Sequence, residues 1–221
     1  RRLWFDSHRE LGREKHSPQT FIKFLYGHLL EEVVLMLLRM TDNDVDSEQK
    51  QVVVDGVSGH MDCKINGEVV DIKTASGFAF RKFKAGTLRE DDPFGYIAQL
   101  AGYEEAEGTD NGGFLVVNKE SGELCFYKPE ELDKPPIRNR IQNITDVLGK
   151  DAPPPALCYR PVAEGKKGNE KIHKNCVFCP HKVVCFKDSN AGKGLRIFKY
   201  NKGLSYFSKV VSKPRVDEVI T

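Results

Sequence analysis

The dipeptide Asn66-Gly67, set between two strand-like segments, constrains the fold of this chain more than any other feature of its sequence. Asn-Gly is the preferred pair for a two-residue β-turn, because such a turn requires positive φ angles at both positions. We therefore expect residues 58–65 and 68–74 to form an antiparallel hairpin. The turn also fixes the register, and the expected facing pairs are Ile65–Glu68, Cys63–Val70 and Asp62–Asp71.

Alternation of side chains along the two strands gives this hairpin an apolar face and a polar face. The apolar face is expected to join the core, and it holds Met61, Cys63, Val70 and Ile72. The polar face holds His60, Asp62, Asp71 and Lys73. The second face is therefore where we expect any chemistry.

Two aspartates that face each other across this hairpin are the first candidate site. The Cβ atoms of Asp62 and Asp71 should lie about 4.5–5.5 Å apart. Carboxylates this close repel each other, and they either share a proton or bind a cation. Mg²⁺ and Mn²⁺ prefer oxygen ligands, and the carbonyl of Ile72 can supply one more. Lys73 points to the same side, where it can orient or deprotonate a water or neutralise charge on a phosphate. An ordinary surface hairpin is the alternative.

The rest of the sequence predicts an α/β fold with a mixed central sheet flanked by helices. Ser17-Pro18 marks the start of a helix that runs to about Met40. The other expected elements are a strand at 52–54, a loop at 76–92, a helix from Pro93-Phe94 to about Glu107, a hairpin of 114–118 with 124–127, and a helix from Pro135-Pro136 to about Leu148.

The first helix is very apolar, but charged and polar side chains interrupt it at His28, Glu31 and Glu32. We therefore expect a buried helix and no membrane span. Residues three and four positions apart share a helical face, so His28 can lie beside a glutamate. His28 is a candidate metal ligand, with Glu31 or Glu32 orienting it. A hydrogen-bonded core histidine is the alternative.

The second helix carries a stripe of polar-tipped side chains. Tyr96, Gln99 and Tyr103 fall at i, i+3 and i+7, where a core stripe would more often have Leu or Ile. These side chains can hold the hairpin residues or contact a substrate. The polar edge of an amphipathic helix is the alternative.

Taken in order, these motifs resemble the PD-(D/E)xK nuclease superfamily, specifically its RecB-like branch. The matching positions, over about residues 20–105, are Gly27-His28, Gly59-His60-Met61-Asp62, Asp71-Ile72-Lys73, Tyr96-Ile97-Ala98-Gln99 and Tyr103. The resemblance implies a restriction-endonuclease-like core at residues 17–150. The family often has Glu where this chain has Asp71, which keeps the chemistry and can shift the metal.

The resemblance also implies a metal-dependent DNA nuclease. His28, Asp62 and Asp71 would bind Mg²⁺ or Mn²⁺, and Lys73 would assist attack of water on a phosphodiester. Gln99 and Tyr103 would position DNA or the catalytic lysine. Stand-alone chains of this size resemble bacteriophage exonucleases, which process DNA ends for recombination or degrade host DNA. The implied activity is an exonuclease in the cytoplasm, acting on DNA ends or single strands.

Four of the six cysteines lie near the end of the sequence in the pattern C-x17-C-x2-C-x5-C. They are Cys158, Cys176, Cys179 and Cys185. The first residues lack the apolar run of a signal peptide, so a metal site is expected rather than a disulfide framework. Four thiolates with one tight CxxC pair suit Zn²⁺ or an iron–sulfur cluster. His173 or His181 can replace a thiolate at zinc.

RecB-like nucleases with a terminal iron–sulfur cluster have a similar C-x2-C-x5-C run. They include the CRISPR-associated adaptation nucleases and the AddB-type helicase-nucleases, in which the fourth cysteine precedes the nuclease core. In this chain Cys158 takes that place. The resemblance implies a [4Fe–4S] cluster, with Zn²⁺ as the alternative, in a small metal-stapled module at residues 151–190.

Two segments are candidates for contact with DNA. Residues 76–84 interleave aromatic and basic side chains, which suits stacking on unpaired bases with phosphates held nearby. The candidates are Phe80, Arg81, Lys82 and Lys84, together with Tyr96. Residues 182–215 hold nine Lys and Arg against one acid, so we expect residues 191–221 to form a basic arm. For the first segment the alternative is a mobile loop, and for the second it is a solvated tail.

Two alternative functions remain for the whole chain. One is a non-catalytic, metal-stapled nucleic-acid-binding module, and the other is a zinc-ribbon interaction protein.

Overall fold

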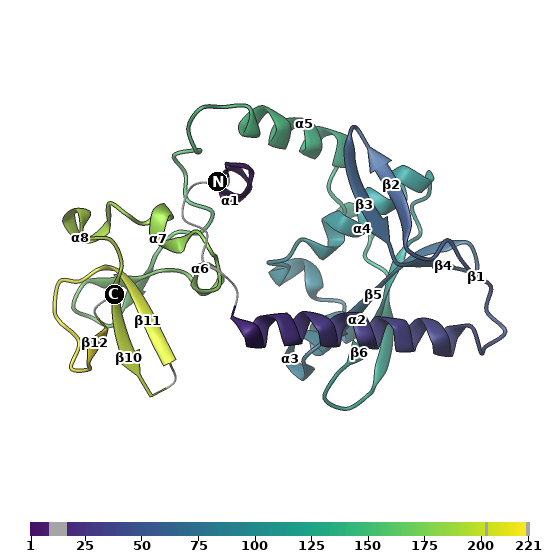
Figure 1. Ribbon diagram of the computed structural model, residues 1–221, viewed down its shortest axis with the longest axis horizontal. Coiled ribbons are helices and arrows are strands. Elements are labelled where there is room, and N and C mark those ends of the chain that lie inside the picture. The colour runs from purple at the N-terminus through teal and green to yellow at the C-terminus, as the bar shows by residue number, and fades with distance from the viewer. Residues whose placement is uncertain (9–16, 202, 220–221) are drawn as a thin grey trace. The chain divides into compact units, whose positions relative to one another are not determined.

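The fold is that of a computed structural model, which describes residues 1–8, 17–201 and 203–219 (Figure 1). The chain forms two compact units. We call His16–Ile144 the central unit, and Arg1–Lys15 with Thr145–Thr221 the terminal unit. No helix among the described residues has the length and apolar character needed to cross a membrane.

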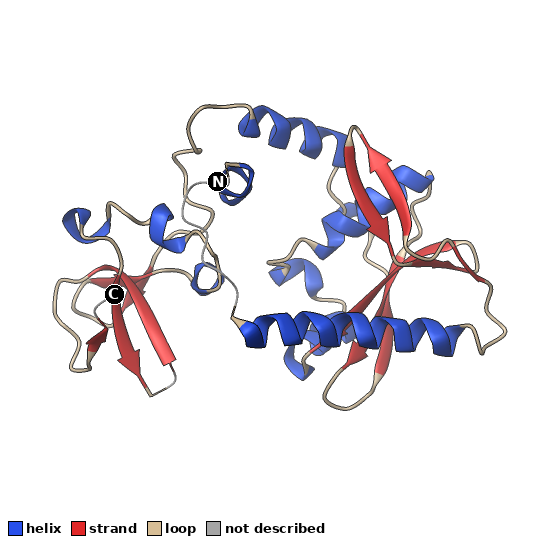
Figure 2. Cartoon of the chain, viewed as in Figure 1, coloured by secondary structure: helices blue, strands red, loops and turns tan. Residues whose placement is uncertain are grey.

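The central unit is an α/β structure, as the sequence predicts (Figure 2). Its strands are β1 (Val45–Asp46), β2 (Lys50–Val54), β3 (Val57–Met61), β4 (Cys63–Ile65), β5 (Glu68–Ala75), β6 (Gly113–Asn118) and β7 (Leu124–Tyr127). Its helices are α2 (Pro18–Leu38), α3 (Gly77–Lys84), η1 (Leu88–Asp91), α4 (Tyr96–Glu107) and η2 (Glu131–Asp133), and α5 (Ile137–Leu148) leads out of it.

A mixed five-stranded sheet in the order β1-β4-β5-β6-β7 organises this unit. Strands β5 and β6 are parallel, and the other neighbours are antiparallel. Strand β5 is the middle strand, and side chains on both of its faces are buried. The second expected hairpin, β6–β7, is also present. The expectation of a mixed central sheet flanked by helices is confirmed.

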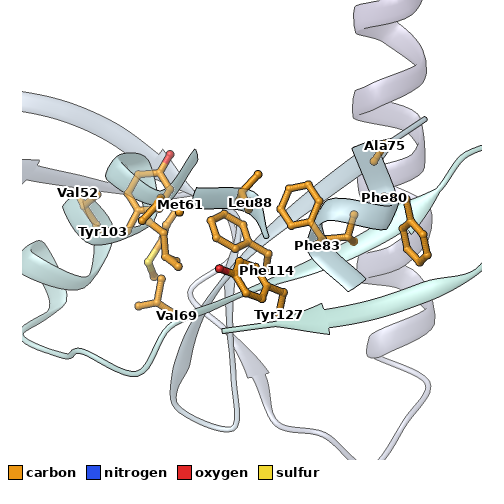
Figure 3. Packing of buried hydrophobic residues seen from close by; sticks show 13 residues of the cluster. Val52, Met61, Val69, Ala75, Phe80, Phe83, Leu88, Tyr103, Phe114 and Tyr127 are labelled. Atoms are coloured by element: carbon orange, nitrogen blue, oxygen red, sulfur yellow. The ribbon is translucent and has the colours of Figure 1, made fainter. Parts of the chain in front are cut away.

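Helices cover both faces of the sheet. On one face, Val34 and Leu35 of α2 pack against Val70 and Ile72 of β5. On the other face, α3 and α4 pack over a larger cluster that includes Phe83, Leu100, Val69 and Phe114 (Figure 3). The middle of β5 is therefore shielded from water on both sides. Asp71 and Lys73 lie on this part of the strand.

The strand expected at 58–65 is interrupted at Asp62. Strand β3 ends at Met61 and pairs with β2 as a separate two-stranded sheet, whereas β4 begins at Cys63. Met61 packs in the cluster of Val69, and Cys63 packs in the cluster of Val70. The expectation that Met61 shares a face with Cys63 is therefore wrong, because the break at Asp62 changes the alternation.

The segment 76–92, expected as a loop, contains helix α3 and the short helix η1. Ser76 caps α3, since its hydroxyl accepts a hydrogen bond from Ala79 N. Phe80 and Phe83 lie one turn apart and are both buried, which is the amphipathic spacing of a surface helix. The following helix α4 starts at Tyr96, later than expected, because the Asp92 carboxylate accepts hydrogen bonds from three successive backbone N–H groups there.

Helix α2 is far less buried than expected. Only Val34 and Leu35 of its side chains are buried. Many of its apolar side chains are about half exposed, including Leu25 and Leu29. The expectation of a buried helix is wrong over most of its length, because one stripe contacts the sheet and the helix is apolar on its other faces as well.

The terminal unit contains a second five-stranded sheet, in the order β12-β10-β11-β9-β8. Its elements are α1 (Arg2–Ser7), β8 (Val162–Glu164), β9 (Asn169–Lys171), α6 (Lys174–Val177), α7 (Lys182–Cys185), α8 (Ser189–Gly192), β10 (Arg196–Tyr200), β11 (Gly203–Lys209) and β12 (Glu218–Val219). Strand β11 pairs with β9, so segments 151–190 and 191–221 contribute to one sheet. The basic segment is therefore not a free arm where it forms these strands.

Candidate active site

The hairpin at the centre of the sheet has the predicted register from Cys63 to Glu68, but the predicted strand pair Asp62–Asp71 is absent because β4 begins at Cys63. Strands β4 and β5 pair with Cys63 opposite Val70. Asn66 and Gly67 have φ angles of 52° and 81°, as a two-residue turn of this kind requires. The local sequence is thus sufficient to set the positions of the polar residues that follow on β5.

Asp62 lies at an open edge of β5, just before β4 begins. The pairing of β4 reaches Val70, and no described strand pairs with the next stretch of this edge. The backbone N–H of Ile72 points to this gap, where it donates a hydrogen bond to Oδ2 of Asp62 at 2.6 Å. Burial raises the pKa of Asp62, although this hydrogen bond and the charge of Lys73 oppose the effect. A ligand role for the Ile72 carbonyl stays a prediction.

Asp71 is buried in the middle of β5, with 0% of its surface exposed. Neither of its carboxylate oxygens has a hydrogen-bond partner of good geometry among the described residues. Burial raises the pKa of Asp71 to about 7; the charge of Lys73 opposes this rise and the charge of Asp62 adds to it. A buried carboxylate in such surroundings destabilises the fold unless a cation balances it.

Lys73 supplies part of that balance. Its Nζ lies 2.6 Å from Oδ2 of Asp71 and 3.3 Å from Oε1 of Gln99. It also lies 5.1 Å from the centre of the Tyr96 ring. Burial lowers the pKa of Lys73, but the charge and contact of Asp71 outweigh it, so the pKa is raised. Lys73 is therefore an ammonium group at neutral pH in this arrangement, which favours charge neutralisation over deprotonation of a water.

Side chains of helix α4 contact Lys73 and position it. Nε2 of Gln99 donates a hydrogen bond of 2.8 Å to the hydroxyl of Tyr103, while Oε1 of Gln99 faces Lys73. Tyr103 packs close to Gly59, where any Cβ atom would lie 3.1 Å from the ring. The three side chains that the sequence placed on one stripe, Tyr96, Gln99 and Tyr103, are thus all near Lys73 or linked to it.

Helix α2 contributes charge from the opposite side of the site. The charge of His28 acts on the pKa of Asp62, and the charge of Asp62 acts on the pKa of Glu31, so both residues of α2 lie near Asp62. Burial and the charge of Asp62 raise the pKa of Glu31, and His28 opposes the rise. Glu32 acts instead on Arg39, away from the site. Glu31 is therefore the glutamate of the two that lies near Asp62, and its role in orienting His28 stays a prediction.

The carboxylate pair is a fit for a hard divalent cation. Mg²⁺ commonly takes one or two protein carboxylates and fills its remaining positions with water. The carboxylate oxygens of Asp71, next to Asp62, are ligands of this kind, although Oδ2 is also in an ion pair with Lys73. Across the described residues, no three His, Cys, Asp or Glu side chains are gathered closely enough to form a ready-made metal site. His28 as a direct ligand therefore stays a prediction.

The residues predicted to contact nucleic acid differ in their exposure and in their ion pairs. Phe80 is 2% exposed and packs in the core, so its predicted stacking role is wrong. Lys82 lies 2.8 Å from Asp91, and Lys84 lies 2.5 Å from Glu123. Arg81 is exposed and lies over the ring of Phe78. Arg81, Lys82 and Lys84 remain predicted DNA contacts.

The sequence reasoning missed Phe94, which is 75% exposed beside the site. Its ring stacks on Tyr96 with centroids 5.5 Å apart, and Tyr96 in turn lies under Lys73. A hollow of about 190 Å³ next to these rings is lined in part by Lys73, Lys82 and Phe94. The Pro93-Phe94 pair was interpreted as a helix start, so the exposed ring was overlooked.

The four cysteines of the terminal unit are near one another. Burial raises the pKa of Cys176 to about 11, and Cys179, Cys185 and Cys158 all add to the rise. A thiol in an apolar place does not ionise readily unless a cation stabilises the thiolate. These four cysteines lie on loops and two short helices, but among the described residues no three of them are close enough for a ready-made metal site, so the metal stays a prediction.

The neighbours of this cysteine group come from the start of the chain. Arg1 lies against Cys185 and donates hydrogen bonds to the carbonyls of Pro154 and Pro155. Nε2 of the buried His181 lies 2.8 Å from Oδ1 of Asp6. The buried Nδ1 of His181 has no hydrogen-bond partner among the described residues, so the role of His181 as a substitute ligand for zinc stays a prediction.

No family model matches the sequence. No curated protein matches it either.

Proposed function

We propose that this chain is a divalent-metal-dependent deoxyribonuclease with a restriction-endonuclease-like core. In this proposal it acts as an exonuclease on DNA ends or single strands, in recombination, repair or host DNA degradation. The place of action would be the cytoplasm, of a bacterial host if a phage encodes the chain. The observation that carries the proposal is the fully buried carboxylate of Asp71, which lies beside Asp62 and forms an ion pair of 2.6 Å with Lys73.

That arrangement is hard to explain as ordinary structure. A central strand with both faces covered normally holds apolar side chains, and Asp71 interrupts such a run between Val70 and Ile72. Its charge is costly there, and perturbed carboxylates of this type are concentrated at functional sites. A divalent cation, when bound, supplies Lewis-acid chemistry to phosphodiester hydrolysis.

Each neighbouring side chain has a role in the proposal. Asp62 and Asp71 hold the cation, and the ammonium of Lys73 faces the phosphate and neutralises the charge that develops on it. Gln99 and Tyr103 keep Lys73 in position through their hydrogen bonds. Glu31 lies near Asp62 and Lys73 and adds negative charge around the cation.

The substrate side of the proposal rests on the aromatic surface next to Lys73. Bases of single strands stack on exposed aromatic rings, with little dependence on sequence. Phe94 and Tyr96 offer such a surface beside the lysine. Arg81 and Lys82 both lie in the last turn of α3, and the exposed Arg81 can contact phosphates of the DNA. This favours DNA with an unpaired end as the substrate.

The four cysteines are proposed to hold a [4Fe–4S] cluster, with Zn²⁺ as the alternative. Their mutual proximity and the suppressed ionisation of Cys176 fit a group that is completed by a metal. The role of the cluster would be to fix the loops of the terminal unit. No catalytic step is assigned to it.

End-labelled single- and double-stranded DNA, incubated with Mn²⁺ or Mg²⁺, tests the activity. The wild-type chain should release nucleotides, whereas Asp71→Asn and Lys73→Ala should not. Glu130→Gln and Lys119→Ala change exposed residues of the same charge types and should behave as wild type. Salt-sensitive DNA binding without cation-dependent cleavage would support the alternative of a non-catalytic binding module.

A further inference from the structure

Helix α2 carries a continuous apolar stripe that nothing among the described residues covers. The stripe consists of Ile22, Leu25, Tyr26, Leu29, Val33, Met36, Leu37 and, just past the helix end, Met40. Each of these side chains is at least 45% exposed. At about 100° per residue they fall within an arc of about 120°, opposite the stripe that packs on the sheet.

The size of this stripe is that of an interface and not of scattered surface residues. It extends for about 27 Å along the helix. Its eight side chains together expose on the order of 800 Å², which is about what each partner buries in a standard protein–protein interface. An isolated chain rarely exposes an apolar patch this large.

The spacing within the stripe identifies the kind of partner. Ile22, Tyr26, Leu29, Val33, Met36 and Met40 are separated by steps of four, three, four, three and four residues. This is the repeat of a two-stranded coiled-coil seam, in which every seam residue packs against the facing helix. A helix with the same repeat is therefore the best-fitting occupant, and α2 of a second copy has it.

The stripe is also symmetric about Glu31. When two copies of α2 are placed antiparallel around a two-fold axis at this position, every seam residue meets a seam residue. The facing pairs are then Ile22 with Met40, Tyr26 with Met36, and Leu29 with Val33, and each pair occurs twice. A homodimer interface must be self-complementary in this way.

We propose that the chain forms a two-fold symmetric homodimer through antiparallel pairing of α2. The stripe points away from the sheet, so Glu31 and the rest of the active site remain on the other side of the helix. One feature opposes the pairing: Glu32, at the edge of the stripe near the two-fold axis, approaches the Glu32 of the other copy. The proposal does not depend on the nuclease activity.

Two double variants at the same positions test both the interface and its direction. In Leu29→Lys with Val33→Lys, each lysine faces a lysine of the other copy. In Leu29→Lys with Val33→Glu, each lysine faces a glutamate if the helices are antiparallel, and like charges meet if they are parallel. Both positions are about half exposed in the single chain, so both variants should fold.

Sedimentation equilibrium of the full chain at low salt gives the readout. We expect a wild-type dimer with a dissociation constant in the micromolar range or below. The double-lysine variant should dimerise at least 100-fold more weakly, and the lysine–glutamate variant at least tenfold more strongly than the double-lysine variant. Glu32→Gln, which removes the repulsion at the axis, should tighten the wild-type dimer several-fold.

Other results would overturn the proposal. A wild-type chain that stays monomeric at about 100 μM does not use the stripe for self-association. Equal weakening in the two double variants would exclude the antiparallel register. A monomer whose melting temperature falls in both variants would show that the stripe is covered within its own chain.

Discussion

The carboxylate site of the central unit and the cysteine group of the terminal unit are built in opposite ways. Asp71 and Lys73 lie on one regular strand, and the backbone N–H of Ile72 fixes Asp62 beside them. The cysteines come from a loop and short helices of four residues. The carboxylates are therefore positioned by the sheet itself, whereas the proposed metal would be what holds the cysteine segments together.

The first prediction removes the charge at the centre of the preorganised site. Asp71→Asn should reduce the rate of DNA cleavage on the order of a thousandfold or more, because the cation loses a carboxylate ligand. The fold should remain intact, since Asn is of similar size and removes a buried charge. The rate is measured with labelled DNA at saturating Mn²⁺, and far-ultraviolet circular dichroism checks the fold. Loss of activity below tenfold would contradict the site.

The second prediction concerns the proposed metal site of the four cysteines. Cys176→Ser should destabilise the terminal unit by about 3–5 kcal/mol, because a ligand of the metal is lost. The purified variant should also lose the brown colour and absorbance near about 400 nm expected of an iron–sulfur cluster. Cys125→Ser, a partly exposed cysteine of the central unit, is the matched control. A colourless wild-type chain with one zinc would replace the cluster by Zn²⁺.

The third prediction uses the pH dependence of stability. The pKa of Asp71 is about 7 in the folded chain, above its ordinary value of 3.8. The fold therefore prefers the protonated form, so this contribution to stability is present below about pH 4 and is lost as the pH rises through 7. Without metal, the wild type should lose on the order of 2–4 kcal/mol relative to Asp71→Asn over this range. Urea unfolding at several pH values measures the difference, and added Mn²⁺ should reverse it.

The fourth prediction concerns the exposed ring beside the lysine. Phe94→Ala should weaken binding of single-stranded DNA by about 1–3 kcal/mol, the usual contribution of one stacked base. Leu132→Ala, which changes another highly exposed apolar side chain, should leave binding unchanged. Fluorescence anisotropy with a labelled oligonucleotide, in the inactive Asp71→Asn background, separates binding from cleavage. Equal affinity of Phe94→Ala and its control would remove Phe94 from the substrate path.

The smallest expected effect is on the positioning of Lys73. Gln99→Ala should lower the maximal cleavage rate about tenfold with little change in apparent DNA affinity, because Lys73 loses one contact but keeps its ion pair with Asp71. Gln99→Glu should restore a contact to the lysine. A change in affinity alone would indicate that Gln99 contacts DNA.

The two regions also differ in how much of them could be predicted from sequence. The turn at Asn66-Gly67 and the register next to it are local properties, so the part of the hairpin from Cys63 to Val70 was predicted correctly. The break at Asp62 was not, because it depends on β3 pairing with β2 in another sheet. The exposure of α2 was missed because its apolar residues surround the helix, and periodicity alone cannot identify the covered face.

In the terminal unit, the spacing of the cysteines indicated which residues gather, but not what surrounds them. The contact of Asp6 with His181 joins residues far apart in sequence, and no local pattern predicts it. The basic segment was interpreted from its charge. Its strands were not predicted because charged side chains such as Arg196 alternate with buried ones such as Phe198. Arg196 forms an ion pair with Glu218, so its charge does not prevent it from lying on a strand.

Binding of Mn²⁺ to the carboxylate pair tests the central claim most directly. Electron paramagnetic resonance of the chain titrated with Mn²⁺ at pH 8 should show at least one bound ion in the wild type and one fewer in Asp71→Asn. The affinity of that site should fall as the pH is lowered below 7, where Asp71 becomes protonated. Equal Mn²⁺ binding by the two proteins over this pH range would contradict the account.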